Sequence, residues 1–324
     1  MSISTYDDVL DVLRMGDEEF HSTIAPEAAQ AYREQDGRII VRTVLPYSNR
    51  CKNRCLYCNM RANNKHLDRY AMTVDEILDL ARFAHEEGHT RIFLLSGEDR
   101  KYSLDILLHI IGEIKSMGMY MALAAGEFPA EYYREMKAAG LDEYMVKFEM
   151  AQPDVFDRLN PSTTFEKRMG AIYSILDAGL NLASGNIIDY PGQTLEMCAE
   201  DIMLTKKLGV TWAPVIPYMP ALNTPLAEEG GPGSVERTYR EIALLRLMIP
   251  GVNITSQQPG KDPSLGLTVP ENDYAAIKVG ANVLFRGLVE ARKAERFGIT
   301  SNRNTEGTEH IHAVAEMSGM EISW

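Results

Sequence analysis

Cysteine is scarce in this chain and almost confined to one place. Only four of the 324 residues are cysteine, and three of them are Cys51, Cys55 and Cys58. Three clustered cysteines leave one unpaired, and nothing else in the sequence indicates secretion, so we expect no disulfide framework. The fourth, Cys198, lies at the start of a predicted helix, where a small buried apolar residue is a better interpretation than a further ligand.

Long apolar runs and an excess of positive charge are also missing. No run of about eighteen apolar residues occurs, so no membrane span is predicted. The first residues lack the basic start and apolar run of a signal peptide. With 33 basic and 46 acidic residues the formal charge is −13, which argues against nonspecific binding to nucleic acid or anionic membrane. We therefore expect a cytoplasmic protein with neither of these partners.

The remaining composition is that of an ordinary globular protein, with 45% hydrophobic and 24% charged residues. The length permits two domains, although α/β barrels of this size are commonly one domain. We expect a helical N-terminal extension over 1–36, a barrel over 37–290, and a C-terminal tail with a helix over 291–324.

Short apolar segments alternate with segments of helical period along most of the chain. Eight segments are predicted as strands: 38–45, 91–95, 119–123, 144–149, 182–188, 212–217, 252–256 and 281–285. Helical period predicts helices at 74–87, 104–115, 129–139, 165–178, 195–208, 235–249, 274–279 and 312–317. Strands separated by helices form parallel sheets. Eight such units favour a closed (β/α)8 barrel over an open doubly wound sheet.

Polar residues follow the predicted strands at the ends where such barrels hold their active sites. They include Ser96, Gly97, Glu98, Glu127, Lys147, Glu149, Asp189, Gln257, Gln258 and Arg286. A buried charge needs a partner. An internal ion pair, such as Glu149 with Arg168, is one explanation for any single residue. Their convergence on one rim favours a ligand that carries both an ammonium and a carboxylate.

The three clustered cysteines have the spacing C-x3-C-x2-C, one thiolate short of a closed four-ligand site. A zinc site would need a fourth ligand, for which His66 is the nearby candidate. A 4Fe–4S cluster on three cysteines keeps one iron without a protein ligand, free to bind a small molecule. Tyr57, an aromatic residue just before the last cysteine, completes the pattern.

This pattern resembles the signature of the radical S-adenosylmethionine (SAM) enzymes, which cleave SAM at a 4Fe–4S cluster to a 5′-deoxyadenosyl radical. Over about residues 38–290 the chain is similar to HydE, the radical SAM maturase of FeFe-hydrogenase, in the group with PylB (3-methylornithine synthase) and biotin synthase. The likeness rests on Pro217 and on the segments 48–58, 64–65, 69–70, 96–99, 126–129, 165–168, 191–194, 223–227 and 280–283.

The resemblance implies roles for particular residues and a complete barrel with cluster and SAM at its top. Cys51, Cys55 and Cys58 would ligate the cluster, and Tyr57 would pack near the adenine. Segment 96–98, which is Ser96, Gly97 and Glu98, matches the part that receives the methionine amino group. Glu149 and Arg168 match residues that hold the ribose and the methionine carboxylate. A low-potential electron donor such as ferredoxin or flavodoxin is implied as a partner.

The substrate region departs from the HydE pattern. Strand four has Lys147 where HydE has arginine, Gln257 and Gln258 replace a run of small residues, and Arg286 follows the last strand. We expect these four residues to hold a small amino-acid-like or thiol-containing substrate. Genuine hydrogenase maturation, a PylB-like carbon-skeleton rearrangement and a non-catalytic iron–sulfur protein are the alternatives. Biotin synthase is disfavoured because its additional cysteines have no counterparts.

Overall fold

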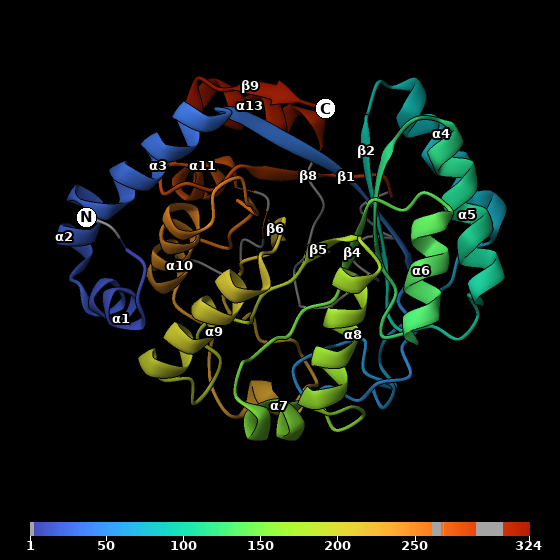
Figure 1. Ribbon diagram of the computed structural model, residues 1–324, viewed down its shortest axis with the longest axis horizontal. Coiled ribbons are helices and arrows are strands. Elements are labelled where there is room, and N and C mark those ends of the chain that lie inside the picture. The colour runs from blue at the N-terminus through green and yellow to red at the C-terminus, as the bar shows by residue number, and fades with distance from the viewer. Residues whose placement is uncertain (1–2, 261–266, 268, 290–306) are drawn as a thin grey trace.

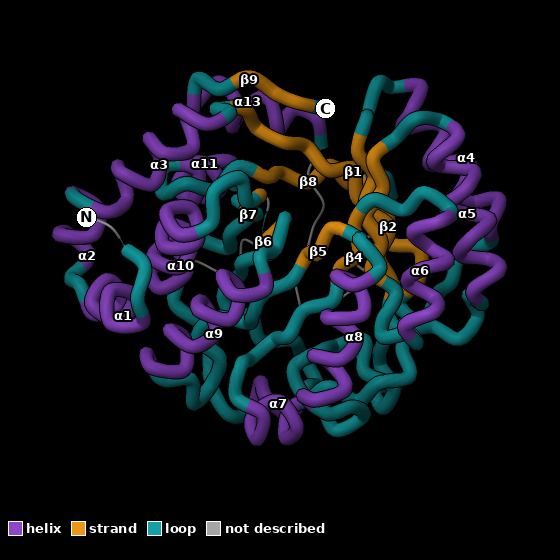
Figure 2. The backbone as a smooth tube through the Cα atoms, viewed as in Figure 1, coloured by secondary structure: helices purple, strands orange, loops and turns teal. Residues whose placement is uncertain are grey.

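The computed structural model describes residues 3–260, 267, 269–289 and 307–324. Within them, eight parallel strands form a ring with helices outside it (Figures 1 and 2). The strands are β1(Arg38–Ser48), β2(Arg91–Ser96), β3(Tyr120–Ala124), β4(Glu143–Met145), β5(Asn181–Ala183), β6(Trp212–Ala213), β7(Asn253–Ile254) and β8(Val283–Gly287). Neighbours in the chain are neighbours in the sheet, and β8 returns to β1.

The ring closes between β7 and β8 through a single parallel bridge. Thr255 pairs with Val283 there, and the Ser256 N–H donates to the Val283 carbonyl at 2.9 Å. An open doubly wound sheet would leave two free edges, so the prediction of a (β/α)8 barrel is confirmed.

The outer layer contains the helices that connect the strands. They are α4(Val74–Glu86), α5(Leu104–Ser116), α6(Ala130–Ala138), α7(Pro153–Leu159), α8(Phe165–Asp177), α9(Leu195–Leu208), α10(Val235–Met248) and α11(Pro270–Ile277). Side-chain caps start many of them: Thr73 and Glu76 form a reciprocal capping box on α4. Gly88 follows that helix with φ 85°, a conformation that suits glycine.

Several boundaries differ from the sequence-based prediction. Strands β4 to β7 are shorter than predicted, because the chain after each leaves the sheet to form the rim of the barrel. The helix α7 and the strand β9(Glu321–Ser323) were not predicted. The C-terminal helix, α13(Thr308–Ser318), is longer than the predicted 312–317, and β9 pairs in parallel with the start of β1.

A second helical layer covers one side of the barrel. The helices α1(Tyr6–Arg14), α2(Asp17–Ser22) and α3(Ile24–Gln35) lie outside α9 and α10, at the left of Figure 1. Their apolar faces are buried, with Val9 and Phe20 fully covered. In the described part of the chain, no helix has the length and apolar character needed to cross a bilayer.

The barrel interior is apolar at its centre and contains an ion pair near the N-terminal ends of the strands. Phe93, Trp212 and Phe285 pack there with ring centroids 5.0 to 6.5 Å apart. Below them the buried Arg42 guanidinium lies 4.0 Å from the Trp212 ring centre and pairs with the fully buried Glu143. This pair lies toward the N-terminal ends of the strands, away from the loops that follow the strands.

Candidate active site

The cysteine loop follows β1 and is shaped by one arginine. Arg69 donates from Nη1 to the carbonyls of Asn49 and Met60 at 2.7 and 2.8 Å, and from Nη2 to Arg61 and Asn64. One guanidinium therefore satisfies four backbone acceptors of a segment without helix or strand. Sequence reasoning gave Arg69 no such role, although an arginine within a long polar loop is a signal of this use.

The three loop thiols lie close enough to affect one another. The pKa of Cys55 is raised to about 12, mainly by burial; the Arg168 guanidinium opposes the rise, and the nearby Cys51 and Glu149 add to it. Burial is also the main cause of the raised pKa of Cys51 and of Cys58, and thiolate neighbours add to the latter. Protonated thiols are therefore favoured until a metal group displaces the protons.

A second loop packs tightly against the cysteines. The Glu98 N–H points at Cys51 Sγ at 3.4 Å, and the Lys52 N–H donates to the Glu98 carbonyl at 3.1 Å. A Cβ on Gly97 would lie 2.3 Å from the Arg50 carbonyl oxygen and 2.7 Å from Cys51 Cβ, so only glycine permits this approach. The loops after β1 and β2 thus form one unit.

These residues fit a 4Fe–4S cluster better than a single zinc ion. Among the described residues, no three His, Cys, Asp or Glu side chains converge on a point where one ion would sit, so His66 does not complete a zinc site. In a cluster each thiolate binds a different iron, so the thiols need to surround a space rather than meet at a point. Three mutually interacting thiols, partly shielded from solvent, meet that requirement.

A cavity opens from this loop into the barrel, with about 990 Å³ of empty space when its mouth is included. Its lining is mainly apolar, with Phe93, Trp212 and Phe285 among the lining residues. Lys147 and Glu149 supply the charges, and their Nζ and Oε2 atoms lie 3.3 Å apart. The structure therefore brings an ion pair to the edge of an apolar chamber.

The backbone at Glu149 is unusual for a residue with a side chain. Its φ is 64°, and two backbone hydrogen bonds hold it, from its own N–H to Gly185 and from the Ile187 N–H to its carbonyl. The Lys147 ammonium donates to the Asn186 carbonyl at 2.8 Å. The loops after β4 and β5 therefore fix both charged side chains, and strain of this kind is typical of functional sites.

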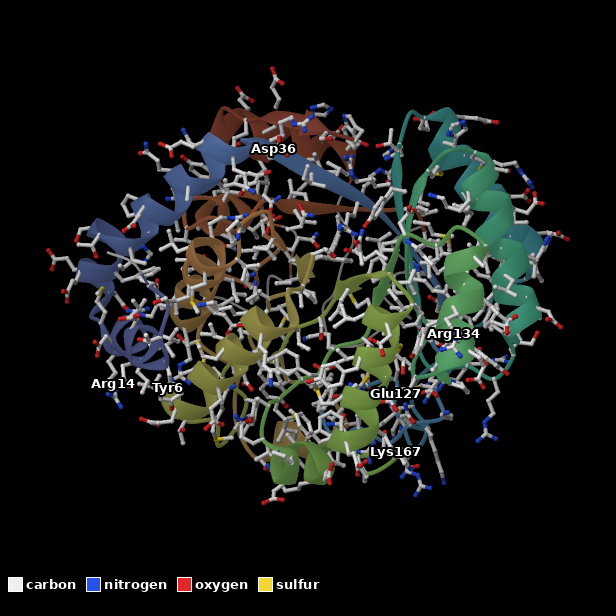
Figure 3. All side chains as sticks on the ribbon, in the orientation of Figure 1. Tyr6, Arg14, Asp36, Glu127, Arg134 and Lys167 are labelled. Carbon is white, nitrogen blue, oxygen red and sulfur yellow. The ribbon has the colours of Figure 1, made fainter. Side chains whose placement is uncertain are left out.

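The ion pairs around the cavity differ from the expected arrangement. Arg168 Nε donates to Glu127 Oε1 at 2.5 Å, and its Nη1 donates to the Lys147 carbonyl. Glu149 pairs with Lys147 instead, so the internal Glu149–Arg168 pair considered from sequence is not formed. In Figure 3, Glu127 lies beside α8 and Lys167 lies on that helix.

The other predicted residues lie in different places. Tyr57 lines the cavity and donates to Asn160 Oδ1 at 2.6 Å, and Gln257 also lines it. Ser96 donates to the Gly97 carbonyl. Gln258 is fully buried behind the wall, where its Nε2 donates to the Val215 carbonyl at 3.0 Å.

Arg286 faces away from the cavity. Strand β8 extends to Gly287, so Phe285 points into the barrel while Arg286 points outward and donates to Thr308 Oγ1 of α13 at 3.3 Å. The predicted strand ended at residue 285, which placed Arg286 on the rim. The structure does not bring this arginine to the substrate region.

A family model described as the radical SAM superfamily matches residues 45–204. The [FeFe] hydrogenase maturase subunit HydE of Thermotoga maritima is 34% identical over 275 residues, which cover 85% of this chain and 77% of that protein. The chain is a HydE-like member of the radical SAM superfamily. The motif resemblance found in the sequence is thereby confirmed.

Two further comparisons support the fold and the wider group. The solved structure of methylornithine synthase (PylB) superposes with a TM-score of 0.83, covering 99% of this chain and 94% of that one at 18% identity. A biotin synthase of Leptothrix cholodnii is 26% identical over 248 residues, 73% of this chain and 68% of that protein. As a radical SAM enzyme, the protein uses a 4Fe–4S cluster and SAM, acts on a small molecule and takes electrons from a reductant.

Proposed function

We propose that Cys51, Cys55 and Cys58 hold the cluster and that the enzyme acts on a small amino-acid-like or thiol-containing molecule in the barrel cavity. The observation that carries this proposal is the Lys147–Glu149 ion pair at the edge of an aromatic chamber. There the Lys147 ammonium offers a counter-charge to an anionic head group, and the aromatic rings can pack against a small apolar body.

When bound, the cluster supplies the electron that cleaves SAM to the radical that attacks the substrate. This chain's own residues bind and orient. The Ser96–Glu98 segment offers backbone and carboxylate acceptors to the methionine ammonium, next to Cys51. The Arg168 guanidinium, held by Glu127, presents donors to the methionine carboxylate.

The residues that line the cavity have different tasks in this proposal. Glu149 accepts hydrogen bonds from the hydroxyl groups of the ribose. Tyr57 packs near the adenine, and a hydrogen bond from the Tyr57 hydroxyl to Asn160 holds the ring in place. On the substrate side, Lys147 and Gln257 provide donors, and the apolar rings exclude water from the reacting centre. Gln258 supports the wall through Val215, and Arg286 takes no part.

Hydrogenase maturation is the second candidate, because the relative that is 34% identical is named as a maturase. The features that favour a different substrate are Lys147, Gln257 and Gln258, which differ from the HydE pattern. A PylB-like rearrangement of an amino-acid skeleton belongs to the same proposal. A reducing cytoplasm is the proposed location, because an oxygen-sensitive cluster requires it.

The test is isotopic. Anaerobically reconstituted enzyme is incubated with SAM, dithionite and each of a panel of deuterated amino acids and thiols. We expect deuterium to enter 5′-deoxyadenosine with at least one of them, and the Cys55→Ala variant to show none. Absence of transfer from the whole panel, together with activation of an immature FeFe-hydrogenase, would replace the proposal with the maturase function.

A further inference from the structure

A fully buried carboxyl group reaches the loop after β5 and takes no part in the function proposed above. Glu241 of α10 accepts hydrogen bonds at Oε2 from Asn186 Nδ2 at 3.2 Å and from the Cys198 thiol at 3.7 Å. Its other oxygen, Oε1, is buried and has no hydrogen-bond partner within the described part of the chain. Burial of a half-satisfied carboxyl group is costly, so its presence needs an explanation.

Asn186 connects this carboxyl group to the ion pair of the cavity. Its side chain binds Glu241, while its backbone carbonyl accepts a hydrogen bond from Lys147 Nζ at 2.8 Å. Asn186 also pairs with Glu149 in a parallel bridge, and its two chain neighbours bond to the Glu149 backbone. One asparagine therefore joins three ionisable side chains, two of which line the cavity.

The charges around Glu241 point to Lys147 as the side chain that it affects. The titratable side chains that face Glu241 from neighbouring elements are Lys147 after β4, and Cys198 and Asp201 on α9. Charged side chains on adjacent turns of α10 have ion-pair partners of their own: Arg237 with Asp189, Arg240 with Asp17 and Glu236 with His21. Lys147 is the cation of the facing group, and the attraction between two charges is mutual.

We propose that Glu241 is a positioning residue that acts through Asn186 and Lys147, so that the cavity binds an anionic head group more tightly while Glu241 is protonated. The proposal rests on the function proposed above, in which Lys147 meets that head group. With Glu241 neutral, the charges of Lys147 and Glu149 balance, and a carboxylate can approach the ammonium. With Glu241 ionised, the group carries one more negative charge and repels the carboxylate. The proton is exchanged with solvent.

Burial sets the pH at which this change occurs. It raises the pKa of Glu241 to about 7, so both protonation states are populated near neutral pH. The protonated form predominates below that pH, and binding of an anionic head group should therefore weaken as pH rises through it. One additional charge behind the wall of a partly enclosed cavity is enough for roughly a tenfold change in affinity.

The first measurement follows Lys147 itself. Lysine labelled with carbon-13 at Cε is incorporated, and the reconstituted, oxidised holoenzyme is titrated from about pH 5.5 to 8.5 by nuclear magnetic resonance, with Lys147→Arg identifying the signal. Wild type should show a step in the Lys147 chemical shift near pH 7. Glu241→Gln keeps an acceptor for Asn186 but cannot ionise, so the step should vanish. Asp273→Asn, which changes another fully buried carboxyl group on α11, is the control and should keep the step.

The second measurement uses butyrate, a small carboxylate with an apolar body, as the probe. Its dissociation constant is obtained from the Lys147 signal at about pH 6 and pH 8, at constant ionic strength. In wild type we expect the constant to rise about tenfold between these pH values, although butyrate is ionised at both. In Glu241→Gln it should change by less than about twofold. A residue that only stabilised the fold would not produce this pH dependence.

Three results would overturn the proposal: an unchanged step in Glu241→Gln, no step in wild type, or no binding of butyrate by wild type at pH 6. An equal rise of the dissociation constant in both proteins would also do so. If both measurements agree with expectation but no compound of the deuterated panel is a donor, the proposed function fails and the control of cavity charge by Glu241 stands. If deuterium is transferred and the Lys147 signal does not respond to Glu241, this proposal fails alone.

Discussion

Arg168 and Glu127 form an ion pair beside the cysteine loop, with Nε and Oε1 2.5 Å apart. Because Arg168 pairs with Glu127, Glu149 pairs with Lys147, whose Nζ lies 3.3 Å from Glu149 Oε2. Two carboxylates of the same rim therefore have different tasks. Glu127 orients a guanidinium, while Glu149 presents its carboxylate in the cavity wall.

This division predicts a selective effect on SAM binding. Glu149→Gln removes a charged acceptor, which is worth about 1.5–3 kcal/mol, so we expect the dissociation constant for SAM to rise by roughly 10- to 100-fold. Equilibrium dialysis with reconstituted protein measures it. Glu166→Gln, on the exposed first turn of α8, is the control and should change the constant by less than about twofold. Equal affinities for wild type and Glu149→Gln would contradict the assignment.

Gly97 gives a prediction about the cysteine loop itself. A methyl group there meets the Arg50 carbonyl at 2.3 Å, so Gly97→Ala must displace backbone that carries Cys51. We expect the reconstituted variant to bind clearly less iron and sulfide than wild type while its far-ultraviolet circular dichroism is unchanged. Gly112→Ala, in α5 with open space around it, is the control and should add up to about 1 kcal/mol of stability. Full iron content in Gly97→Ala would show that the loops need not approach so closely.

The ion pair at the bottom of the barrel predicts a large stability effect. Glu143→Gln leaves the Arg42 guanidinium buried without its counter-charge, and we expect a loss of about 3–5 kcal/mol in the free energy of unfolding. Denaturant unfolding measures this loss. Asp79→Asn breaks the exposed pair with Arg82 and should cost less than about 1 kcal/mol. Similar losses in the two variants would mean that the buried pair contributes no more to the free energy of unfolding than the exposed pair does.

A fully buried carboxyl predicts how stability depends on pH. Burial raises the pKa of Glu241 from its ordinary 4.5 to about 7, while hydrogen bonding from Asn186 and the charge of Lys147 oppose the rise. Cys198 and Asp201 face it from α9. Because the folded state holds this proton more tightly, the stabilisation is complete below pH 4.5 and is lost as pH rises through about 7. The loss amounts to about 3 kcal/mol.

Unfolding free energies of Glu241→Gln between pH 5 and 8 test this prediction. The variant should match wild type near pH 5 and exceed it near pH 8, since glutamine cannot ionise. The exposed Glu113→Gln is the control and should run parallel to wild type across the range. If Glu241→Gln also ran parallel, Glu241 would not be the group responsible.

The alternation of strands and helices was predictable because each element has its own local signal. Thr73 caps α4, Gly88 follows it, and Ile92 to Leu95 form a continuous apolar run. The cluster ligands were predictable for a similar reason, since three cysteines at that spacing lie within eight residues. Local sequence patterns were therefore sufficient to predict both the barrel and the cysteine motif.

The partners of individual side chains were not predictable, because they depend on register and backbone conformation. Strand β8 ends two residues later than predicted, so Arg286 lies within the strand and points to the outer layer instead of lying on the rim. The pairing of Arg168 with Glu127 depends on where the first turns of α8 meet the loop after β3, 41 positions earlier in the chain. The positive φ of Glu149 has no signal in residue type, since it is imposed by backbone bonds to Gly185 and Ile187.

The most direct test of the account is whether three cysteines hold a cluster that SAM can bind. Iron and sulfide are quantified after anaerobic reconstitution, and electron paramagnetic resonance spectra of the reduced protein are recorded before and after SAM is added. The account predicts about four irons and four sulfides per chain, a spectrum that changes with SAM, and loss of both in Cys51→Ala, Cys55→Ala and Cys58→Ala. A chain without a cluster, or a cluster whose spectrum is indifferent to SAM, would contradict it.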